Sequence, residues 1–508
     1  MILEKQTASV DRRSFLRAGG MAAGVTIFGG TALQALTMRV AEAAPQDKGG
    51  GKDRSGANVD YGPISLAAAL NTGDRWLALP AGFEYTILTK TGAVMSDGRL
   101  TPRAHDGMGA FAQRRGTTRL ICNHEIRFNG EAVPSQGTFV IDGVGSNDPT
   151  AGGGTTSIDF DPRQFRTSSG GKVRDFVSMR GSVVNCAGGM SLGQRAWITS
   201  EEIVQGPDTS PATAKRHGYN FFVPVDTDSP VTPEPLVAMG RFAHEAVAVD
   251  PRSGIVYETE DAGSGVGSGF YRFLPVNPRE LSKGGELQML AVKGQPQADL
   301  REGQRQSKPL SVEWVTITNP DPAGSNDVFN EGLAKGGAKF NRLEGCWAGD
   351  GSIFFSSTSG GDVKNGDVNS DGFREGYGQI WEYRPRGNSG GQLILLFESP
   401  DGDVLDSPDN IVVTPRGGIL ICEDDSSSAN EGQNDTSRFF GEDKNRLVGL
   451  TMQGEAFTFA ENILSEAELA GACWSDDGEF LFVNIFGEDV PDSGGTVAIT
   501  GPWKRGAL

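Results

Sequence analysis

One short pattern recurs about six times along this 508-residue chain: a glycine-centred turn, a few apolar residues, and then a polar or acidic residue. The repeats are roughly 50 to 100 residues apart, which leaves room for one four-stranded blade each. We therefore expect an all-β fold, a six-bladed β-propeller with loop and short helical insertions. The apolar pairs of the pattern are Leu120-Ile121, Trp197-Ile198, Val256-Tyr257, Phe354-Phe355, Leu420-Ile421 and Leu481-Phe482.

The composition agrees with many turns and short strands. The chain has 72 glycines and 26 prolines and is only 37% hydrophobic, which favours strands and turns over long helices. No linker rich in Pro, Gly or Ser divides the repeats, so residues 76–508 are expected to form a single β-propeller domain.

The N-terminal segment has the features of an export signal. Arg12-Arg13 is followed by Phe15-Leu16, a mildly apolar stretch and the small-residue triplet Ala41-Glu42-Ala43. Residues 1–43 are thus expected to be a bacterial twin-arginine signal peptide, and residues 44–75 a flexible leader. The twin-arginine export machinery is the expected partner, the location is periplasmic or secreted, and no transmembrane segment is expected in the mature form.

The charge and the ligand-type residues narrow the function. A formal net charge of −19 disfavours nucleic acid as a partner, and four histidines are too few for a histidine-rich zinc centre. Carboxylates are plentiful, as Ca²⁺ requires. The five cysteines cannot all pair. Cys122 and Cys422 are expected to be core residues, whereas Cys186, on an expected glycine-rich turn, is a candidate metal thiolate.

Polar residues follow each apolar pair of the repeat. Strands arrayed radially would bring these residues to one rim, where converging carboxylates indicate hard metal ions. A separate segment, Asp367–Gly372, matches the first half of a calcium-binding loop but lacks the glutamate at its twelfth position. A solvated acidic turn and a weak calcium site are both compatible with this segment.

Several distant phrases, taken together, resemble the PhoX-type alkaline phosphatases. This family comprises secreted, twin-arginine-exported phosphomonoesterases with a six-bladed propeller and an iron and calcium centre. The resemblance extends from about residue 100 to 485. The phrases are Asn185–Gly189, Arg241–Asp250, Glu258–Ala262 and Arg342–Gly345, supported by His105–Met108, Asn123–Glu125, Ser407–Asn410 and Glu423-Asp424.

The resemblance implies specific roles. Cys186 matches the thiolate ligand of Fe³⁺, Glu245 and Glu344 match carboxylates that hold iron and bridge towards Ca²⁺, and Arg342 matches the arginine that grips the phosphate. These four residues are the expected catalytic set. The remaining Ca²⁺ ligands would come from a pool of six residues: Glu125, Glu201, Glu260, Asp261, Asp409 and Glu423.

Three functions remain open at this stage. The first is a metal-dependent alkaline phosphatase, expected to be monomeric, that hydrolyses small phosphate monoesters outside the cytoplasm. The second is a calcium-dependent propeller lactonase or esterase. The third is a non-catalytic secreted propeller that calcium stabilises and that binds a protein or polymer. Cys186 discriminates among them, because neither alternative requires a thiolate at that position.

Overall fold

The computed structural model describes residues 60–126, 148–263, 265–424, 444–451, 453–487 and 491–508. The expected signal peptide lies outside this part of the chain. Within it the fold is all-β, as predicted, with one α-helix, α3 (Asp327–Ala334), and several short 3-10 turns. None of its helices has the length and apolar character needed to cross a bilayer.

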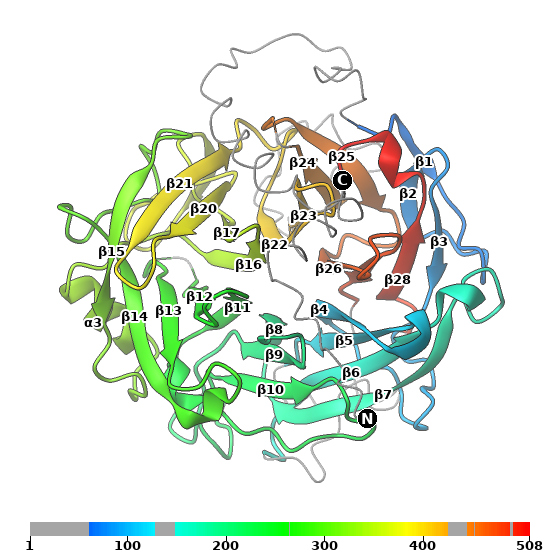
Figure 1. Ribbon diagram of the computed structural model, residues 1–508, viewed down its shortest axis with the longest axis horizontal. Helices are drawn as coiled ribbons and strands as arrows, with labels where there is room; N and C mark the ends of the chain where they lie inside the picture. The colour runs from blue at the N-terminus through cyan, green and yellow to red at the C-terminus, as the bar shows by residue number, and fades with distance from the viewer. Residues whose placement is uncertain (1–59, 127–147, 264, 425–443, 452, 488–490) are drawn as a thin grey trace, which may run out of the picture.

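The sheets are arranged radially around a central axis, in a propeller-like fashion (Figure 1). Neighbouring strands within each sheet are antiparallel, and sequential strands run outwards from the axis. Three of the sheets are β4 (His105–Ala112), β5 (Thr118–His124), β6 (Gly153–Phe160) and β7 (Lys172–Ser182); β8 (Asn185–Met190), β9 (Ala196–Glu201) and β10 (Asn220–Pro224); and β26 (Leu469–Trp474), β27 (Leu481–Ile485), β28 (Gly495–Thr500) and β3 (Glu84–Ile87).

A nine-stranded sheet occupies a larger sector of the ring. It contains two antiparallel meanders that are joined at their outer edges, where β15 pairs with β21. Its strands, in spatial order, are β11 (His244–Val249), β12 (Val256–Glu260), β13 (Phe270–Pro275), β14 (Gly285–Val292), β15 (Leu310–Thr316), β21 (Gly391–Glu398), β20 (Gln379–Pro385), β17 (Ser352–Ser357) and β16 (Leu343–Gly349). A separate hairpin, β18 (Lys364–Val368) and β19 (Arg374–Gly376), follows β17.

Strands from the two ends of the described chain share sheets. Near the N-terminus, β3 pairs with the C-terminal strand β28, and β2 pairs with β25. The strand β1 lies within the expected leader, residues 44–75, and pairs with β2. Where the leader ends and the domain begins stays a prediction. The six-stranded sheet is β1 (Ile64–Leu66), β2 (Leu77–Pro80), β25 (Ala456–Asn462), β24 (Arg446–Leu450), β23 (Ile419–Glu423) and β22 (Pro408–Val413).

The repeated apolar pairs occupy equivalent strands. Each pair lies in the second strand from the axis, and all twelve side chains are buried between neighbouring sheets. These strands are β5, β9, β12, β17, β23 and β27. The expected core cysteines Cys122 and Cys422 are buried in the hydrophobic core, which confirms that prediction.

The innermost strands form a closed ring around the axis. In ring order β4, β8, β11, β16, β22 and β26 each contact the next, and β26 contacts β4. Small residues allow this close approach: a Cβ at Gly345 would lie 2.7 Å from the backbone of Asp409, and one at Gly107 would lie 2.5 Å from the backbone of Ala187. The axis is therefore packed backbone against backbone.

This packing gives a test of the ring. Gly345→Ala places a methyl group against the backbone of β22, which cannot yield as a flexible side chain could, so we expect a loss of about 1–3 kcal/mol in stability. Gly206→Ala is the matched control, because a Cβ there meets only ordinary contacts of 3.5 Å or more. Thermal unfolding of both variants measures the difference. Equal melting temperatures for the two would contradict close packing at the axis.

Candidate metal centre

Each inner strand carries a β-bulge within its first four residues. The pairing register shifts between His105 and Met108 in β4, and between Asn185 and Gly188 in β8. Equivalent shifts occur in β11, β16, β22 and β26. A bulge turns a side chain out of the regular alternation of a strand. Five of the six bulges contain an acidic residue or a cysteine, whereas the bulge of β26 contains Gly471 and Ala472. The five residues are Asp106, Cys186, Glu245, Glu344 and Asp409.

A second set of acidic residues follows the second strands directly. Glu125 comes after β5, Glu202 after β9 and Asp261 after β12. Together with the bulge residues they form four groups of three side chains, in each of which candidate ligand atoms lie within 4.8 Å of one another. The groups are Asp106–Glu125–Cys186, Cys186–Glu202–Glu245, Glu202–Asp261–Glu344 and Glu245–Glu344–Asp409.

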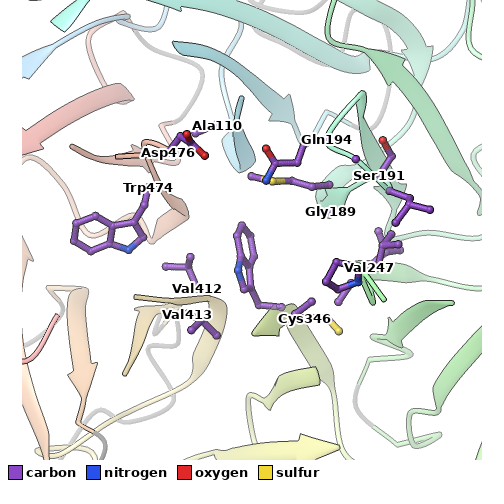
Figure 2. Close-up of a pocket in the computed structure, with 18 residues that line it drawn as sticks. Ala110, Gly189, Ser191, Gln194, Val247, Cys346, Val412, Val413, Trp474 and Asp476 are labelled. Carbon is purple, nitrogen blue, oxygen red and sulfur yellow. The ribbon is translucent and has the colours of Figure 1, made fainter. Parts of the chain in front are cut away.

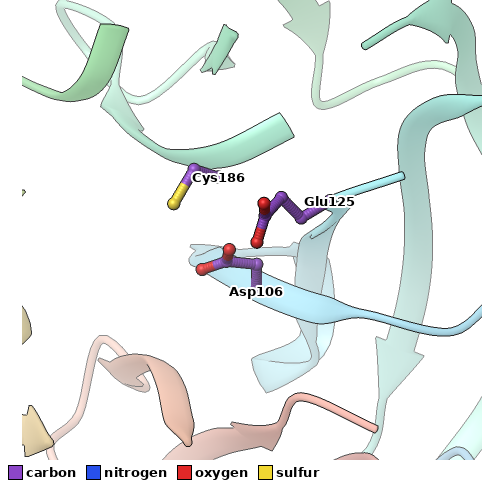
Figure 3. A group of neighbouring side chains, drawn as sticks. All are labelled: Asp106, Glu125 and Cys186. Atoms are coloured by element: carbon purple, nitrogen blue, oxygen red, sulfur yellow. The ribbon is translucent and has the colours of Figure 1, made fainter. Parts of the chain in front are cut away.

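The four groups share members and so constitute one continuous site. Cys186 and Glu202 connect the first three groups, and Glu245 and Glu344 connect the fourth. Figure 3 shows one end of this site, where Asp106 and Glu125 from one sheet lie beside Cys186 from the neighbouring sheet. We call these eight residues the axial cluster: Asp106, Glu125, Cys186, Glu202, Glu245, Asp261, Glu344 and Asp409.

Two members of the axial cluster have buried oxygens with no protein partner. Both carboxylate oxygens of Glu245 lack a hydrogen bond in the described chain, as does Oδ1 of Asp106. Both residues are almost fully buried, with 0% and 1% exposure. Leaving such an oxygen unpaired costs about 1–3 kcal/mol. The arrangement therefore fits a site that is completed by bound cations.

Arg342 supplies positive charge at the edge of the cluster. Its Nε and Nη2 donate to Oδ2 of Asp261 at 3.0 and 2.9 Å, and Nη2 lies 3.1 Å from Oε1 of Glu344. The side chain is 31% exposed, and Nη1 donates no hydrogen bond to any described residue. The guanidinium is thus fixed by Asp261 and retains donor hydrogens for an anionic ligand.

The electrostatics of the cluster favour bound cations. Burial, followed by the charges of neighbouring carboxylates, raises the pKa of Asp106, Glu202, Glu245 and Glu344 well above its ordinary value. Burial also raises the pKa of Asp409 to about 6, and burial and nearby carboxylates raise the pKa of the Cys186 thiol. Metal ions would reverse these shifts by stabilising the ionised forms.

Asp261 is the exception. Burial opposes its ionisation, but the Arg342 guanidinium lowers its pKa. Arg342 also lies beside Glu344, but there burial and the neighbouring carboxylates outweigh its charge and the pKa of Glu344 stays raised.

The backbone is strained where several inner strands begin. Four non-glycine residues with left-handed φ lie two positions before a bulge residue, with φ of 52° at Ala104, 48° at Val184, 41° at Arg342 and 46° at Ser407. Such conformations cost on the order of 1–3 kcal/mol each and are enriched at functional sites. Here they accompany the bulges that direct side chains to the axis.

The structure brings together seven of the ten predicted site residues: Cys186, Glu245, Glu344, Glu125, Asp261 and Asp409 in the cluster, and Arg342 beside it. The other three are bound by other groups of the protein. Glu201 accepts hydrogen bonds from His217 and from the N–H groups of Val183, Gly218 and Tyr219.

The remaining two predicted ligands also face the protein core. Glu260 accepts hydrogen bonds from the hydroxyl of Tyr271 at 2.6 Å and from the N–H of Gly269 at 2.9 Å. Glu423 pairs with the buried Arg446 through Nε at 2.7 Å and Nη2 at 2.5 Å. Glu201, Glu260 and Glu423 belong to none of the groups found in the described chain, and we leave them out of the proposed ligand set.

Two cluster residues were absent from the predicted set. Asp106 lies in the His105–Met108 phrase, and Glu202 directly follows Glu201. Glu468, just before β26, borders the cluster, because it bonds to Asp409 and its pKa is raised by burial and by Asp424 and Asp106. The strand repeat contained the signal for Glu202, since it occupies the same position as Glu125 and Asp261.

Two further expectations need correction or completion. Asn185–Gly189 is not a turn but the first part of strand β8, in which the bulge gives Cys186 its orientation. Within the half-matched calcium loop, Asp371 is paired with Arg301 at 2.7 Å and Lys339 at 3.3 Å. These ion pairs favour the acidic-turn interpretation of that segment.

A family model described as "Alkaline phosphatase PhoX" matches residues 59–488. No curated protein matches the sequence.

Among solved structures, PhoX from Pseudomonas fluorescens, in complex with the transition state analogue vanadate, has a TM-score of 0.61 and 16% identity. That match covers 89% of this chain and 99% of the other. A gluconolactonase from Xanthomonas campestris has a TM-score of 0.40 and 11% identity, over 87% and 98%. The first likeness supports the propeller-like fold.

The raised pKa values predict how stability depends on pH without metal. Between its ordinary pKa and its raised folded pKa, a buried carboxyl binds more protons in the folded than in the unfolded state, so stability falls as pH rises. For Asp409 this window runs from 3.8 to about 6. We expect chelator-treated protein to melt at a lower temperature at pH 8 than at pH 5, and Ca²⁺ to remove most of the difference.

Differential scanning calorimetry with and without chelator measures this effect. Glu245→Gln removes one of the groups with a raised pKa, so the metal-free variant should show a shallower dependence than the parent protein. If the metal-free parent were as stable at pH 8 as at pH 5, ionisation of the cluster would not destabilise the folded protein, contrary to this prediction.

Proposed function

The chain belongs to the PhoX alkaline phosphatase family, and from this premise we propose that it hydrolyses small phosphate monoesters outside the cytoplasm with iron and calcium ions held by the axial cluster. The family supports a phosphatase. The single observation that carries the metal-dependent mechanism is the convergence of eight acidic or thiol side chains, with the unpaired oxygens of Glu245 and Asp106 among them.

The donor set suits two classes of metal. Carboxylate oxygens predominate, which favours Ca²⁺, and Cys186 adds a softer thiolate, which favours a transition metal such as Fe³⁺. Cys186 belongs to two groups, with Asp106 and Glu125 on one side and Glu202 and Glu245 on the other. We assign the iron to the surroundings of Cys186 and Glu245, and calcium to the groups that contain Glu344.

Bound cations would supply Lewis acidity, offsetting the negative charge of the phosphoryl oxygens and lowering the pKa of an attacking water. The chain's own residues position the substrate. Asp261 holds the Arg342 guanidinium through Nε and Nη2, so that Nη1 would be available to donate to the ester's phosphoryl group. A guanidinium held in this way orients the phosphate without first losing its own conformational freedom.

Three finer features complete the proposal. The nine-stranded sheet is interpreted as two blades joined by β15, which brings the count to six. The mature protein is exported by the twin-arginine route and acts in the periplasm or beyond it as a monomer. Twin-arginine export carries folded cargo, which is compatible with a cluster that is assembled before export.

A matched pair of glutamates tests the ligand set. Glu245→Gln removes a ligand charge and should abolish iron binding and lower kcat by about a hundredfold or more, since even indirect perturbation of a metal site costs 10–100-fold. Glu258→Gln is the control: Glu258 is also fully buried, and it accepts a hydrogen bond from Asn220 at 2.9 Å but belongs to none of the groups.

Elemental analysis and circular dichroism of both variants make the comparison. Retention of iron and activity in Glu245→Gln, or equal loss in both variants, would refute the assignment of Glu245.

The reaction itself is tested with a chromogenic phosphate monoester. We expect hydrolysis that requires Ca²⁺ and is inhibited by vanadate, which binds the Pseudomonas fluorescens PhoX as a transition state analogue. Arg342→Gln should raise KM and weaken vanadate inhibition by about tenfold or more, because a charge-assisted contact to the phosphoryl group is lost. Calcium binding without iron, together with lactone but not phosphate hydrolysis, would favour the lactonase alternative instead.

A further inference from the structure

A second cavity lies on the propeller axis at the opposite end of the inner strands from the axial cluster. It has a volume of about 290 Å³ and is lined by the later residues of β8, β11, β16, β22 and β26 (Figure 2). The same strands carry Cys186, Glu245, Glu344 and Asp409 at their other ends. Ligands of this cavity would therefore contact none of the residues of the proposed phosphatase site.

A constriction separates the two ends of the axis. The space between them measures only about 20 Å³, and glycines and alanines line it together with larger side chains that include Trp197, Trp347 and Ile411. Along β16, Glu344 and Trp347 are three residues apart, which corresponds to roughly 10 Å. A space of about 20 Å³ holds no molecule larger than water, so the cavity and the cluster are separate sites.

The cavity walls are mainly apolar and include two tryptophans. Trp347 packs against three core clusters, and Trp474 packs edge-on against Trp503, with ring centroids 4.6 Å apart. Both indole rings are thus held in place by the core while part of each faces the cavity. Val247, Val412 and Met190 complete the apolar walls.

The charged residues of the lining indicate the sign of the ligand's charge. Asp476 lies at the cavity and is exposed, and it forms no ion pair with any described residue. The lining of this cavity contains no Lys, Arg or His. Arg252, next to the lining residue Pro251, is bound to Asp250 and to the carbonyl of Gly351. With a formal net charge of −19, the protein would repel an anion here.

We propose that this axial cavity binds a small organic cation with an apolar body, of the quaternary ammonium class. The indole rings of Trp347 and Trp474 border the cavity and would attract a cation through their ring quadrupoles, the aliphatic walls would accommodate its methyl groups, and Asp476 would supply the counter-charge. A phosphate ester carries the opposite charge and is excluded. The site is independent of the phosphatase function, because it shares no side chain with the axial cluster.

Choline and its neutral isostere 3,3-dimethylbutan-1-ol test the proposal. Isothermal titration calorimetry uses the full mature protein with saturating Ca²⁺, so that the axial cluster is not available to choline. We expect choline to bind with a Kd on the order of millimolar, and the alcohol to bind at least about tenfold more weakly, since only the charge differs. Equal binding of the two molecules, or binding of neither, would overturn the proposal.

Substitutions of charged residues test whether choline binds in this cavity. Asp476→Asn should weaken the affinity for choline by about threefold or more, because one negative charge is removed. The affinity for the alcohol should not change. The control is Asp350→Asn, which removes an equally exposed carboxylate from the turn after β16 at the same end of the propeller but outside the lining. Equal effects of the two substitutions would mean that bulk charge alone attracts choline.

Trp347→Leu gives an independent check on the rings. It should abolish choline binding while the phosphatase rate and calcium content stay unchanged. If Trp347→Leu fails to fold, Trp474→Leu serves instead, since Trp474 packs against only one core cluster. Undiminished choline binding in a folded tryptophan variant would place the cation elsewhere.

Discussion

The close packing of the inner strands around the axis is the constraint on which the rest of the structure depends. Glycine or alanine follows most of the bulge residues, as in Asp106-Gly107, Cys186-Ala187, Glu245-Ala246 and Glu344-Gly345, and several of these positions leave no space for a larger side chain. This contact brings side chains from different sheets within 4.8 Å of one another. A wider axis would separate them beyond the reach of a shared ion.

The bulges and the packing act together. Without the register shift in each inner strand, the second residue would follow the regular alternation of the pleat. With it, Cys186, Glu245, Glu344 and their equivalents point to the axis. This arrangement lowers the stability of the fold, because residues before four of the bulges have left-handed φ and some buried carboxylate oxygens have no partner. Such features persist when a ligand or a rigid surrounding structure compensates for them.

The sequence repeat predicted more of the fold than of the site. Its apolar pairs identified the second strand of every sheet, because burial between two sheets requires an apolar segment at each equivalent place. After four of the six pairs it also identified two adjacent polar positions, but not which of the two faces the axis. Glu201, Glu260 and Glu423 occupy the first position and are satisfied by the protein; Glu202 and Asp261 occupy the second and join the cluster.

The sequence by itself determined the all-β class, the spacing of the strands, the acidic character of the rim and, through its resemblance to a phosphatase family, the importance of Cys186, Glu245 and Glu344. Only the tertiary structure decided which carboxylates meet, because members of one group, such as Glu245 and Asp409, lie far apart in the sequence and on different sheets. It also decided that Asp106 belongs with Cys186 and that Arg342 is held by Asp261. A local sequence pattern specifies which side chains of a strand are buried and which are exposed. Which side chains meet at the axis depends on how all the sheets close into one ring.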